Sequence, residues 1–276
     1  MAADLHCHTK MSDGSVGIED LVGMAKRAGV DTLAITDHDT FAGATRAKII
    51  GDRIGVRVIP GIEVSAFDRL RGRKVHILGY RFMNPQRLEG LCYKTIQNRK
   101  RAALFMVQKV MRLYPITPEM VSRRAQCSTN IFRQHIMHAL IDAGVTNEFY
   151  GALYHKLFDP KDGVAYYPVE YPDVREAISQ IREAGGIAVL AHPGVYNSYE
   201  LMEELAAEKM LDGVEAFHSR NKPNDAVVLS SFARRNHLLV TGGTDFHGMY
   251  APKPLPLGLC TTPDEYLREL LEFKRR

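Results

Sequence analysis

Histidine, aspartate and glutamate side chains recur along this chain directly after short apolar segments. Those with metal-binding potential are His6, His8, Asp13, His38, Glu63, His76, His192, Asp245 and His247. His6 and His8 are separated by one residue, so on a strand both rings project from the same face and can bind one ion. Asp245 and His247 have the same spacing. These residue types in this arrangement predict a metal centre.

The donor atoms of this set are imidazole nitrogens and carboxylate oxygens, which favours Zn, Mn or Fe over Ca or Mg. Nine ligands are too many for one ion, and an ion with three or four protein ligands keeps a position open for water. Glu63 is the only glutamate in the set, so its two oxygens are the natural bridge between ions. A water shared by bridged ions becomes a hydroxide near neutral pH. We therefore predict hydrolysis, with Glu63, His192 and Asp245 as catalytic residues.

Apolar segments of strand length alternate with amphipathic segments over both ends of the chain. We predict strands over residues 3–7, 32–36, 56–59, 61–67, 74–80, 187–190, 213–217 and 238–241. We predict helices over residues 18–25, 41–54, 173–184, 200–209, 226–235 and 263–273. This alternation is typical of an α/β fold with a parallel sheet or barrel. Strand ends meet on one face of a barrel, so ligands distant in sequence can line a single pocket.

The strand pattern disappears between residues 85 and 158, where helical patterns cover 88–113, 118–124 and 131–143. We interpret residues 81–158 as a helical insertion into a barrel domain formed by residues 1–80 and 159–276. Between Arg81 and Arg133 there are eleven Lys or Arg residues against two Glu, in a chain whose net charge is only +4. The rest of the chain is therefore acidic. A basic insertion over an acidic metal pocket predicts a clamp for an anionic substrate.

The composition is that of a globular protein and argues against a disordered, collagen-like or coiled-coil chain, with 45% hydrophobic and 25% charged residues. No apolar run approaches the roughly 18 residues that span a bilayer, so we expect no membrane contact. The first residues lack a secretory signal, which predicts a cytoplasmic location. The four cysteines are far apart, which favours reduced thiols over disulfides. Nothing implies an obligate protein partner.

Six short motifs together resemble the polymerase and histidinol phosphatase (PHP) family. They are Asp4–Thr9, Ile35–Asp39, Gly61–Val64, His76–Gly79, Ala191–Gly194 and Gly242–His247. The resemblance implies a distorted (β/α)7 TIM-like barrel with three divalent metal ions. It assigns His6, His8, Glu63 and Asp245 to the first ion and Glu63, His76 and His192 to the second. It assigns Asp13, His38 and His247 to the third.

The insertion contains a segment, Ile131–Ile136, that resembles the nucleoside 3',5'-bisphosphate phosphatase and 5'-to-3' exoribonuclease branch of the family. In that branch an arginine and a histidine two residues later bind substrate phosphate, and Arg133 and His135 match them. Arg99 matches a further phosphate-binding arginine in a looser alignment. The segment departs from the branch pattern at Phe132 and Gln134, and at His138 where arginine is common. His218, which follows a predicted strand, is a further candidate for binding phosphate or protonating a leaving oxygen. The alternative for His218 is a structural capping role.

These features favour a metal-dependent phosphoesterase that acts on a nucleotide, a nucleoside 3',5'-bisphosphate or a short oligonucleotide end. Its expected partner is thus an anionic phosphorylated small molecule or a short nucleic acid end. One alternative is a histidinol-phosphate-type phosphomonoesterase, which the Arg133 segment disfavours. Another is an amidohydrolase-like C–N hydrolase, although such enzymes often bridge their ions with a modified lysine where this chain has Glu63. A non-enzymatic metal-binding or polymerase-associated module is a further alternative, which the complete ligand set opposes.

Overall fold

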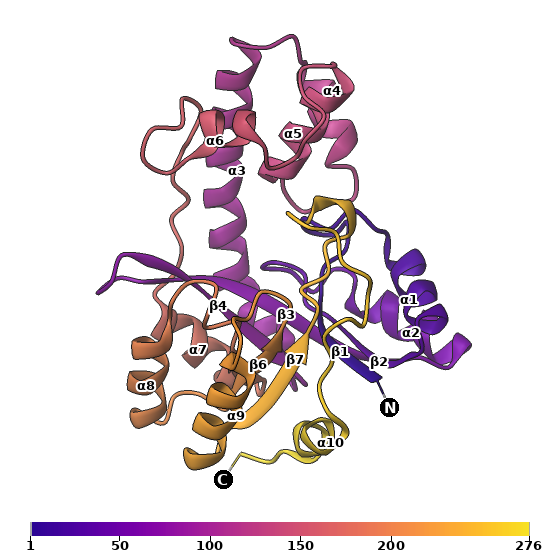
Figure 1. Cartoon of the computed structure of the whole chain (residues 1–276), viewed down its shortest axis with the longest axis vertical. Helices are drawn as coiled ribbons and strands as arrows, with labels where there is room; N and C mark the ends of the chain where they lie inside the picture. The colour runs from indigo at the N-terminus through magenta and orange to yellow at the C-terminus, as the bar shows by residue number, and fades with distance from the viewer. Residues whose placement is uncertain (1, 276) are drawn as a thin grey trace.

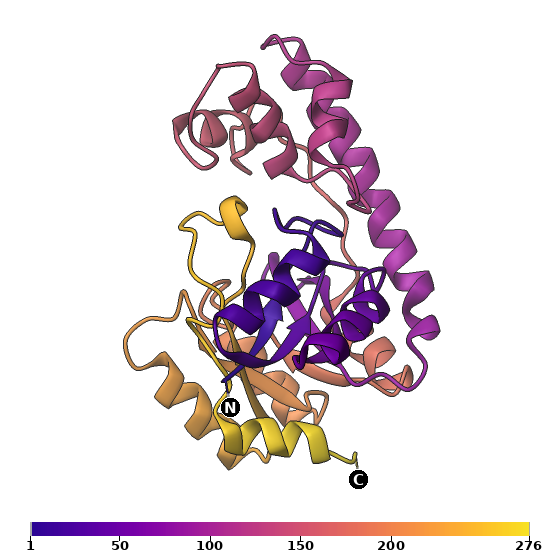
Figure 2. The same cartoon turned by 90° about the vertical axis from the view of Figure 1, so that its right-hand side faces the viewer.

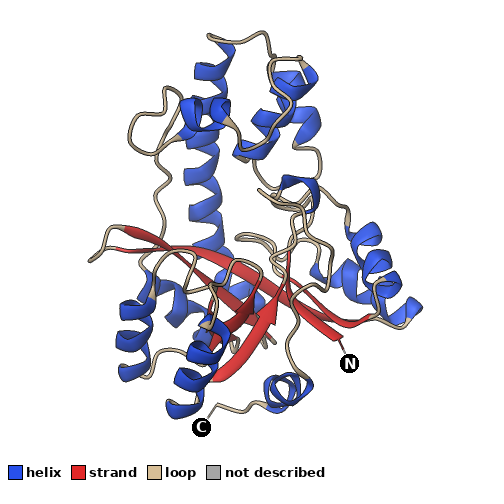
Figure 3. Cartoon of the chain, viewed as in Figure 1, coloured by secondary structure: helices blue, strands red, loops and turns tan. Residues whose placement is uncertain are grey.

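The computed structural model of the protein describes residues 2–275, and its seven strands form one sheet in chain order (Figures 1 and 3). The strands are β1 (Ala2–Cys7), β2 (Val30–Ile35), β3 (Arg57–Asp68), β4 (Arg73–Tyr80), β5 (Ile187–Leu190), β6 (Gly213–His218) and β7 (Leu239–Gly243). The first and last strands meet where Cys7 pairs with Phe246 and the His8 N–H donates to the Phe246 carbonyl at 2.9 Å. The sheet is thus a nearly closed α/β barrel, as predicted.

The parallel pairing that the alternation of strands and helices indicates does not extend to β4, which is antiparallel to both β3 and β5. Four residues connect β3 to β4, too few for the crossover that a parallel pair needs. The two strands predicted over 56–59 and 61–67 also form one continuous strand. Pro60 pairs with Ile35 of β2, whereas Gly61 pairs with Tyr80 of β4. At this Pro-Gly step β3 changes its partner strand, and the chain does not form a loop.

Alternate residues of the strands fill the barrel interior, because successive side chains on a strand point to opposite faces. This buried cluster includes Leu5, Ala34, Ile59, Leu78, Val189 and Leu239. Leu267 and Leu270 of α10 (Asp264–Glu272) belong to the same cluster, so α10 covers one end of the barrel. Tyr80 is also buried there, and its hydroxyl donates to the Leu5 carbonyl, so it packs in the interior and takes no part in the cavity.

Amphipathic helices cover the outside of the barrel. They are α1 (Ile18–Arg27), α2 (Ala44–Ile54), α7 (Val174–Glu183), α8 (Tyr199–Ala207) and α9 (Asp225–Arg235). α7 shows how the sequence sets the packing, because Val174, Ala177, Ile178 and Ile181 recur at helical spacing and are all buried. The Asp173 side chain accepts the Arg175 N–H and so satisfies a free donor at the start of this helix.

The insertion stands over the end of the barrel opposite α10 (Figure 2). It contains η1 (Pro85–Leu88), α3 (Glu89–Met111), α4 (Pro118–Arg124), α5 (Arg133–Asp142) and α6 (Ala152–Phe158). Its helices share their own core, which includes Met106, Ile136, Leu140 and Phe158. The division at residues 81–158 stays a prediction, since Leu88 and Leu91 pack with the barrel core and Ala165 packs with the insertion core.

The remaining expectations concern membranes and thiols. Among residues 2–275, no helix has the length and apolar composition of a membrane span. All four cysteines are free thiols, as predicted.

Candidate metal centre and its cavity

The nine predicted ligands converge at the barrel end that faces the insertion. Those at or just after the end of a strand, where the sequence predicts them, are His6, His8, His38, His192, Asp245 and His247. Asp13 lies in the loop after β1. The prediction of strand ends for Glu63 and His76 is wrong, because both lie inside strands. From Gly61 and up to His76, β3 and β4 form a hairpin that continues beyond the neighbouring strands. Only single bridges, from Glu63 to His38 and from Phe67 to Asp173, join this part of β3 to other described segments. The hairpin therefore carries both residues into the cluster.

Glu63 lies at the centre of the cluster, and its two carboxylate oxygens face different histidines. Oε1 lies 2.8 Å from His76 Nδ1 and 3.0 Å from His192 Nε2. Oε2 lies 3.3 Å from His6 Nε2 and 3.2 Å from His8 Nε2. His38 Nδ1 also lies 3.4 Å from Oε2. Each oxygen therefore faces its own group of imidazoles, an arrangement that suits a carboxylate bridging two cations.

Two aspartates extend the cluster on either side of His8. Asp245 Oδ1 lies 3.3 Å from His8 Nε2 and 3.5 Å from His6 Nε2, beside the Glu63 carboxylate. Asp13 Oδ1 lies 3.3 Å from His247 Nε2, and Asp13 Oδ2 lies 3.8 Å from His38 Nε2. Ligand atoms thus form three close groups: around His6, His8, Glu63 and Asp245; around His38, Glu63 and His76; and around His8, Asp13, His38 and His247.

Several ring nitrogens in the cluster are buried without a hydrogen-bond partner. They are His6 Nε2, His8 Nδ1 and Nε2, His38 Nδ1 and His192 Nδ1. Leaving a polar atom buried and unsatisfied costs about 1–3 kcal/mol, so a concentration of such atoms needs an explanation. Their lone pairs and the adjacent carboxylates suit cations of the Zn, Mn or Fe type. The side chains present therefore fit bound metal ions.

The electrostatics of the cluster support the same conclusion. Burial alone would raise the pKa of Glu63, but the His76, His6 and His38 rings hold it well below its usual value. The neighbouring imidazoles likewise hold the pKa of Asp13 well below its usual value, against the effect of burial. Burial lowers the pKa of His192 to about 4, which keeps its ring neutral and available as a ligand. The surrounding carboxylates, against the effect of burial, raise the pKa of His6 well above its usual value and that of His8 to about 10. The cluster therefore combines ionised carboxylates with imidazoles that attract positive charge and a neutral ring at His192.

Two aspartates of the Ile35–Asp39 motif, outside the predicted ligand set, hold the surrounding loops. Asp37 accepts the Thr9 N–H at 2.8 Å and the Ser12 hydroxyl at 2.6 Å, which fixes the loop that carries Asp13. Asp39 Oδ2 accepts a hydrogen bond from Arg99 at 3.0 Å. The motif contains both aspartates, but their spacing does not show which loop each one contacts.

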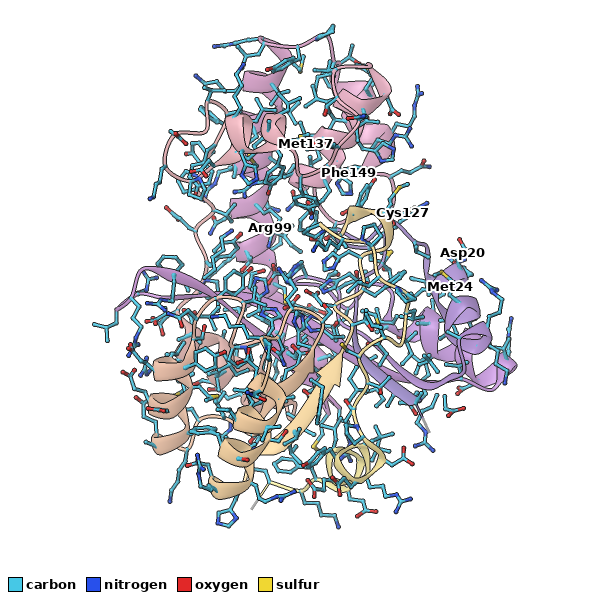
Figure 4. All side chains as sticks on the ribbon, in the orientation of Figure 1. Asp20, Met24, Arg99, Cys127, Met137 and Phe149 are labelled. Carbon is cyan, nitrogen blue, oxygen red and sulfur yellow. The ribbon has the colours of Figure 1, made fainter. Side chains whose placement is uncertain are left out.

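A cavity of about 750 Å³ extends from the ligand cluster to the insertion. Its cationic lining residues are Lys74, Arg99, Arg133, Arg220 and Lys253, and Tyr171 and Tyr196 also line it. Figure 4 shows Arg99 on α3, between the barrel and the part of the insertion that carries Met137 and Phe149. Sequence reasoning identified Arg99 and Arg133 but missed Lys74 and Tyr171, which reach the cavity from β4 and from the segment before α7.

Arg99 and Arg133 of the insertion, together with Lys74 of β4, form one cationic side of the cavity, here called the insertion wall. These three charges are close enough to affect one another. Arg99 lies 4.6 Å above the Phe132 ring and 5.5 Å above the Tyr171 ring. Lys74 lies 5.5 Å from the centre of the same tyrosine ring. Although burial would raise it, Arg99 and Lys74 lower the pKa of the Tyr171 hydroxyl. This wall therefore has the positive potential that attracts an anion.

His135 and His218 differ from their predicted positions, because neither side chain lines the cavity. His135 is 2% exposed, and its Nδ1 accepts the Phe132 N–H at 3.1 Å at the start of α5. His218 Nδ1 accepts the Arg220 N–H at 3.2 Å, and its Nε2 lies 3.3 Å from Asp245 Oδ2. Both rings thus hold other residues in place, and their contact with substrate stays a prediction. His138, which stands where arginine is common in the branch, pairs with the Tyr250 hydroxyl at 2.9 Å.

Known proteins resemble this chain over most of its length. It is 40% identical over 256 residues to the phosphoribosyl 1,2-cyclic phosphate 1,2-diphosphodiesterase of Eggerthella lenta, which covers 92% of this chain and 97% of the relative. It is 34% identical over 252 residues to the 5'-3' exoribonuclease Rnm of Escherichia coli, covering 88% of this chain and 84% of the relative.

The fold also has a close counterpart among solved structures. A Bifidobacterium adolescentis protein described as a metal-dependent phosphoesterase superposes with a TM-score of 0.87 and 33% identity, over 97% of this chain and 94% of that one. The PHP domain model matches residues 4–186, which include the insertion. The chain therefore belongs to the PHP family and is a phosphoesterase, a metal-dependent hydrolase of phosphate esters.

Proposed function

We propose that the enzyme hydrolyses a phosphate ester of a ribose-containing substrate that carries a second phosphate group. The observation behind this proposal is the single cavity that joins the ligand cluster to the cations of the insertion wall. The two ends suit different tasks, because metal ions held by the cluster would activate water for attack on one phosphate while fixed cations bind another. The Eggerthella lenta relative, named for a phosphoribosyl cyclic phosphate, supports a substrate of this kind.

The metal ions would bind as the family resemblance implies. His6, His8, Glu63 and Asp245 would hold the first ion, and Glu63, His76 and His192 the second. Asp13, His38 and His247 would hold the third. The distances from Glu63 Oε1 to His76 and His192 and from Oε2 to His6 and His8 support the first two sets. His38, which the resemblance assigns to the third ion, also lies 3.4 Å from Oε2. When bound, the ions supply an activated water and neutralise the phosphoryl oxygens. Three ions, of Mn, Fe or Zn, are part of this proposal.

The second phosphate would bind at the insertion wall. Asp39 and Ser65 each accept a hydrogen bond from Arg99 at 3.0 Å, so this guanidinium is fixed before substrate enters. Arg133 lies 5.3 Å above the Tyr166 ring and has no carboxylate partner among the described residues. A guanidinium with free N–H groups suits bidentate binding of phosphate. Arg133 would thus bind the phosphate directly, while Lys74 and Tyr171 close the site from β4 and the opposite loop.

A nucleoside 3',5'-bisphosphate is the second candidate substrate. The cavity has an apolar side, lined by Met106, Ile131, Tyr154 and Val169, that a sugar phosphate alone would not use. Ribose with an attached base would bury aromatic surface there. A short RNA end is the oligonucleotide form of the same candidate, in keeping with the exoribonuclease relative. The cytoplasmic location expected from the sequence suits all of these substrates and stays a prediction.

Turnover of a substrate panel, followed as loss of substrate and appearance of each hydrolysis product, tests the proposal, because opening a cyclic phosphate or removing a nucleotide from RNA need not release inorganic phosphate. Protein loaded in turn with Mn, Fe and Zn would be given 5-phosphoribosyl 1,2-cyclic phosphate, adenosine 3',5'-bisphosphate, a 5'-phosphorylated RNA, AMP and histidinol phosphate. We expect the highest kcat/KM for one of the first two. Equal turnover of AMP or histidinol phosphate would contradict the requirement for a second phosphate. A steep loss of RNA turnover with rising salt would instead favour a groove that contacts several phosphates.

A further inference from the structure

Glu215 is a buried carboxylate next to the ligand cluster that the proposed ligand sets do not use. It lies in the middle of β6 and is 0% exposed. A carboxylate in that position needs partners for both oxygens, because burying an unpaired charge is costly. Its two partners come from the ligand sets of two different ions.

The first partner is the ring of His6. Glu215 Oε1 lies 2.9 Å from His6 Nδ1, while the other ring nitrogen, Nε2, faces Glu63 and Asp245 at 3.3 and 3.5 Å. An ionised carboxylate can only accept a hydrogen bond, so Nδ1 must carry the hydrogen. That tautomer leaves the lone pair of Nε2 directed at the proposed first ion.

The second partner is the main chain at His192. Glu215 Oε2 accepts the His192 N–H at 2.9 Å. His192 has a φ angle of +28°, which is an uncommon backbone conformation for a residue with a side chain. A hydrogen bond to a buried carboxylate stabilises this backbone and so fixes the direction in which the His192 ring leaves β5.

A metal-ligand role for Glu215 is the alternative. Its oxygens lie within 4.8 Å of His6 and His218 nitrogens, a group that could by distance hold an ion. Both oxygens are already hydrogen bonded, however, one to a ring N–H and one to a main-chain N–H. An ion at this place would have to displace both bonds, so orientation of the two ligands is the better explanation.

We propose that Glu215 is a positioning residue that orients His6 for the first metal ion and His192 for the second. The proposal rests on the proposed metal centre. Carboxylates that accept the second N–H of a metal-bound histidine typically change metal affinity by about 10–100-fold. A single carboxylate acting on two ligands should affect two ions together.

Glu215→Gln tests this without changing the size of the side chain. Glutamine offers one oxygen and one NH2 group where two acceptors are needed. If the NH2 group faces His6, it donates to Nδ1 and the ring hydrogen moves to Nε2, which blocks the metal-binding nitrogen. If it faces His192, two donors meet at the strained main chain. Either orientation disturbs a ligand.

Asp212 supplies a matched control. It is a buried carboxylate, and its Oδ2 accepts the N–H of Ala188 at 2.9 Å, four residues before His192 in the chain. It also pairs with Arg275 at 2.6 Å. Asp212→Asn therefore removes a charge that supports the same part of the chain, but no ring nitrogen of the cluster contacts it among the described residues. We expect lower stability and unchanged metal affinity.

The measurement is a titration of metal-free protein with Co²⁺, followed by visible absorption and by metal content after gel filtration. We expect Glu215→Gln to bind Co²⁺ about 10–100-fold more weakly than wild type, and its activity to rise towards wild type as metal is added in excess. Glu215→Asp, which keeps the charge on a shorter side chain, should lie between the two and replaces the glutamine variant if that variant does not fold.

The outcomes separate the inference from the proposed function. Wild-type protein that binds no metal would overturn the proposed metal centre and, with it, the role of Glu215. Wild-type binding together with equal affinity in a folded Glu215 variant would overturn the positioning role alone. A loss of activity that excess metal does not relieve would also contradict it, because a purely structural defect behaves in that way.

Discussion

The barrel end and the insertion face the same cavity, but they hold their charged side chains differently. Glu63 is 1% exposed and contacts histidines from several strands, so every ligand depends on its neighbours. In the insertion, Arg99 has one ion-pair partner and Arg133 rests on aromatic rings. The difference indicates a division of labour. In the proposed function, the barrel would provide the chemistry as one interdependent unit, whereas the insertion would bind substrate through side chains that can be changed singly.

The largest effect should follow a change at the centre of the barrel cluster. Glu63→Gln removes the negative charge that faces five histidines, so two of the proposed ions lose a shared ligand. We expect kcat/KM for the best substrate to fall by at least about 10³-fold, with loss of bound metal. Steady-state kinetics and metal analysis check this prediction. Activity close to wild type would show that the cluster does not act as a unit.

Asp68→Asn is the matched control for that change. Asp68 is also 1% exposed and lies on β3, but at its far end, where it accepts N–H groups of the turn before β4. Its substitution should lower stability and leave kcat unchanged. A comparable loss of activity in this control would mean that any damage to β3 disables the enzyme.

The next effect concerns the one insertion histidine that is buried as deeply as the barrel ligands. Burial lowers the pKa of His135 to about 4, against about 6.5 in an unfolded chain. The unfolded state therefore binds more protons between these values, and stability is lost as the pH falls from 6.5 towards 4. In metal-free protein, His135→Gln should reduce this loss by up to about 3 kcal/mol.

Urea denaturation at several pH values measures that difference. His192, whose pKa is also about 4, contributes equally to the wild type and to His135→Gln. The difference between the two plots of unfolding free energy against pH therefore isolates His135. Equal slopes would contradict the prediction. A shallower dependence of stability on pH in His135→Gln, together with an unchanged KM, would show that His135 affects stability alone. Its role would then differ from that of Arg133, which is proposed to bind substrate.

The convergence of the nine predicted ligands could be expected from the sequence because the signal is local. The His6–His8 spacing and the Asp245–His247 spacing each place two donors on one short segment, and alternation with helices places the segments at one barrel end. The sequence could not predict that β3 continues through Pro60. The strand continues there because it changes its partner from β2 to β4, and that change depends on the tertiary structure. Lys74 and Tyr171 were missed because they lie in distant segments of the chain, and no sequence motif indicates that these segments come into contact. Glu215 was missed because a single glutamate inside an apolar strand does not reveal its partners.

A change at the insertion wall should have a smaller and more selective effect. Arg133→Ala removes a charged donor, and hydrogen bonds to charged groups contribute about 1.5–3 kcal/mol. We expect kcat/KM for the substrate with two phosphates to fall by roughly 10–100-fold, mainly through KM, with little change for AMP. Arg101→Ala is the control, because Arg101 lies exposed on α3 and pairs with Asn98. An equal loss for AMP would place Arg133 at the reacting phosphate instead.

The smallest effect should come from the contact that joins the two regions. Tyr250 of η2 (Gly248–Tyr250) lies three residues after the proposed ligand His247, and its hydroxyl pairs with His138 of α5 at 2.9 Å. Tyr250→Phe keeps the ring contact with Phe149 and removes this one hydrogen bond. The expected cost is about 1 kcal/mol, which lowers the melting temperature by about 3 °C in a domain of this size. Because the barrel ligands support one another, kcat should not change, whereas KM should rise slightly as the insertion loosens. A fall in kcat with constant KM would show that the insertion acts on the metal centre through His247, and the division between the two regions would then be wrong.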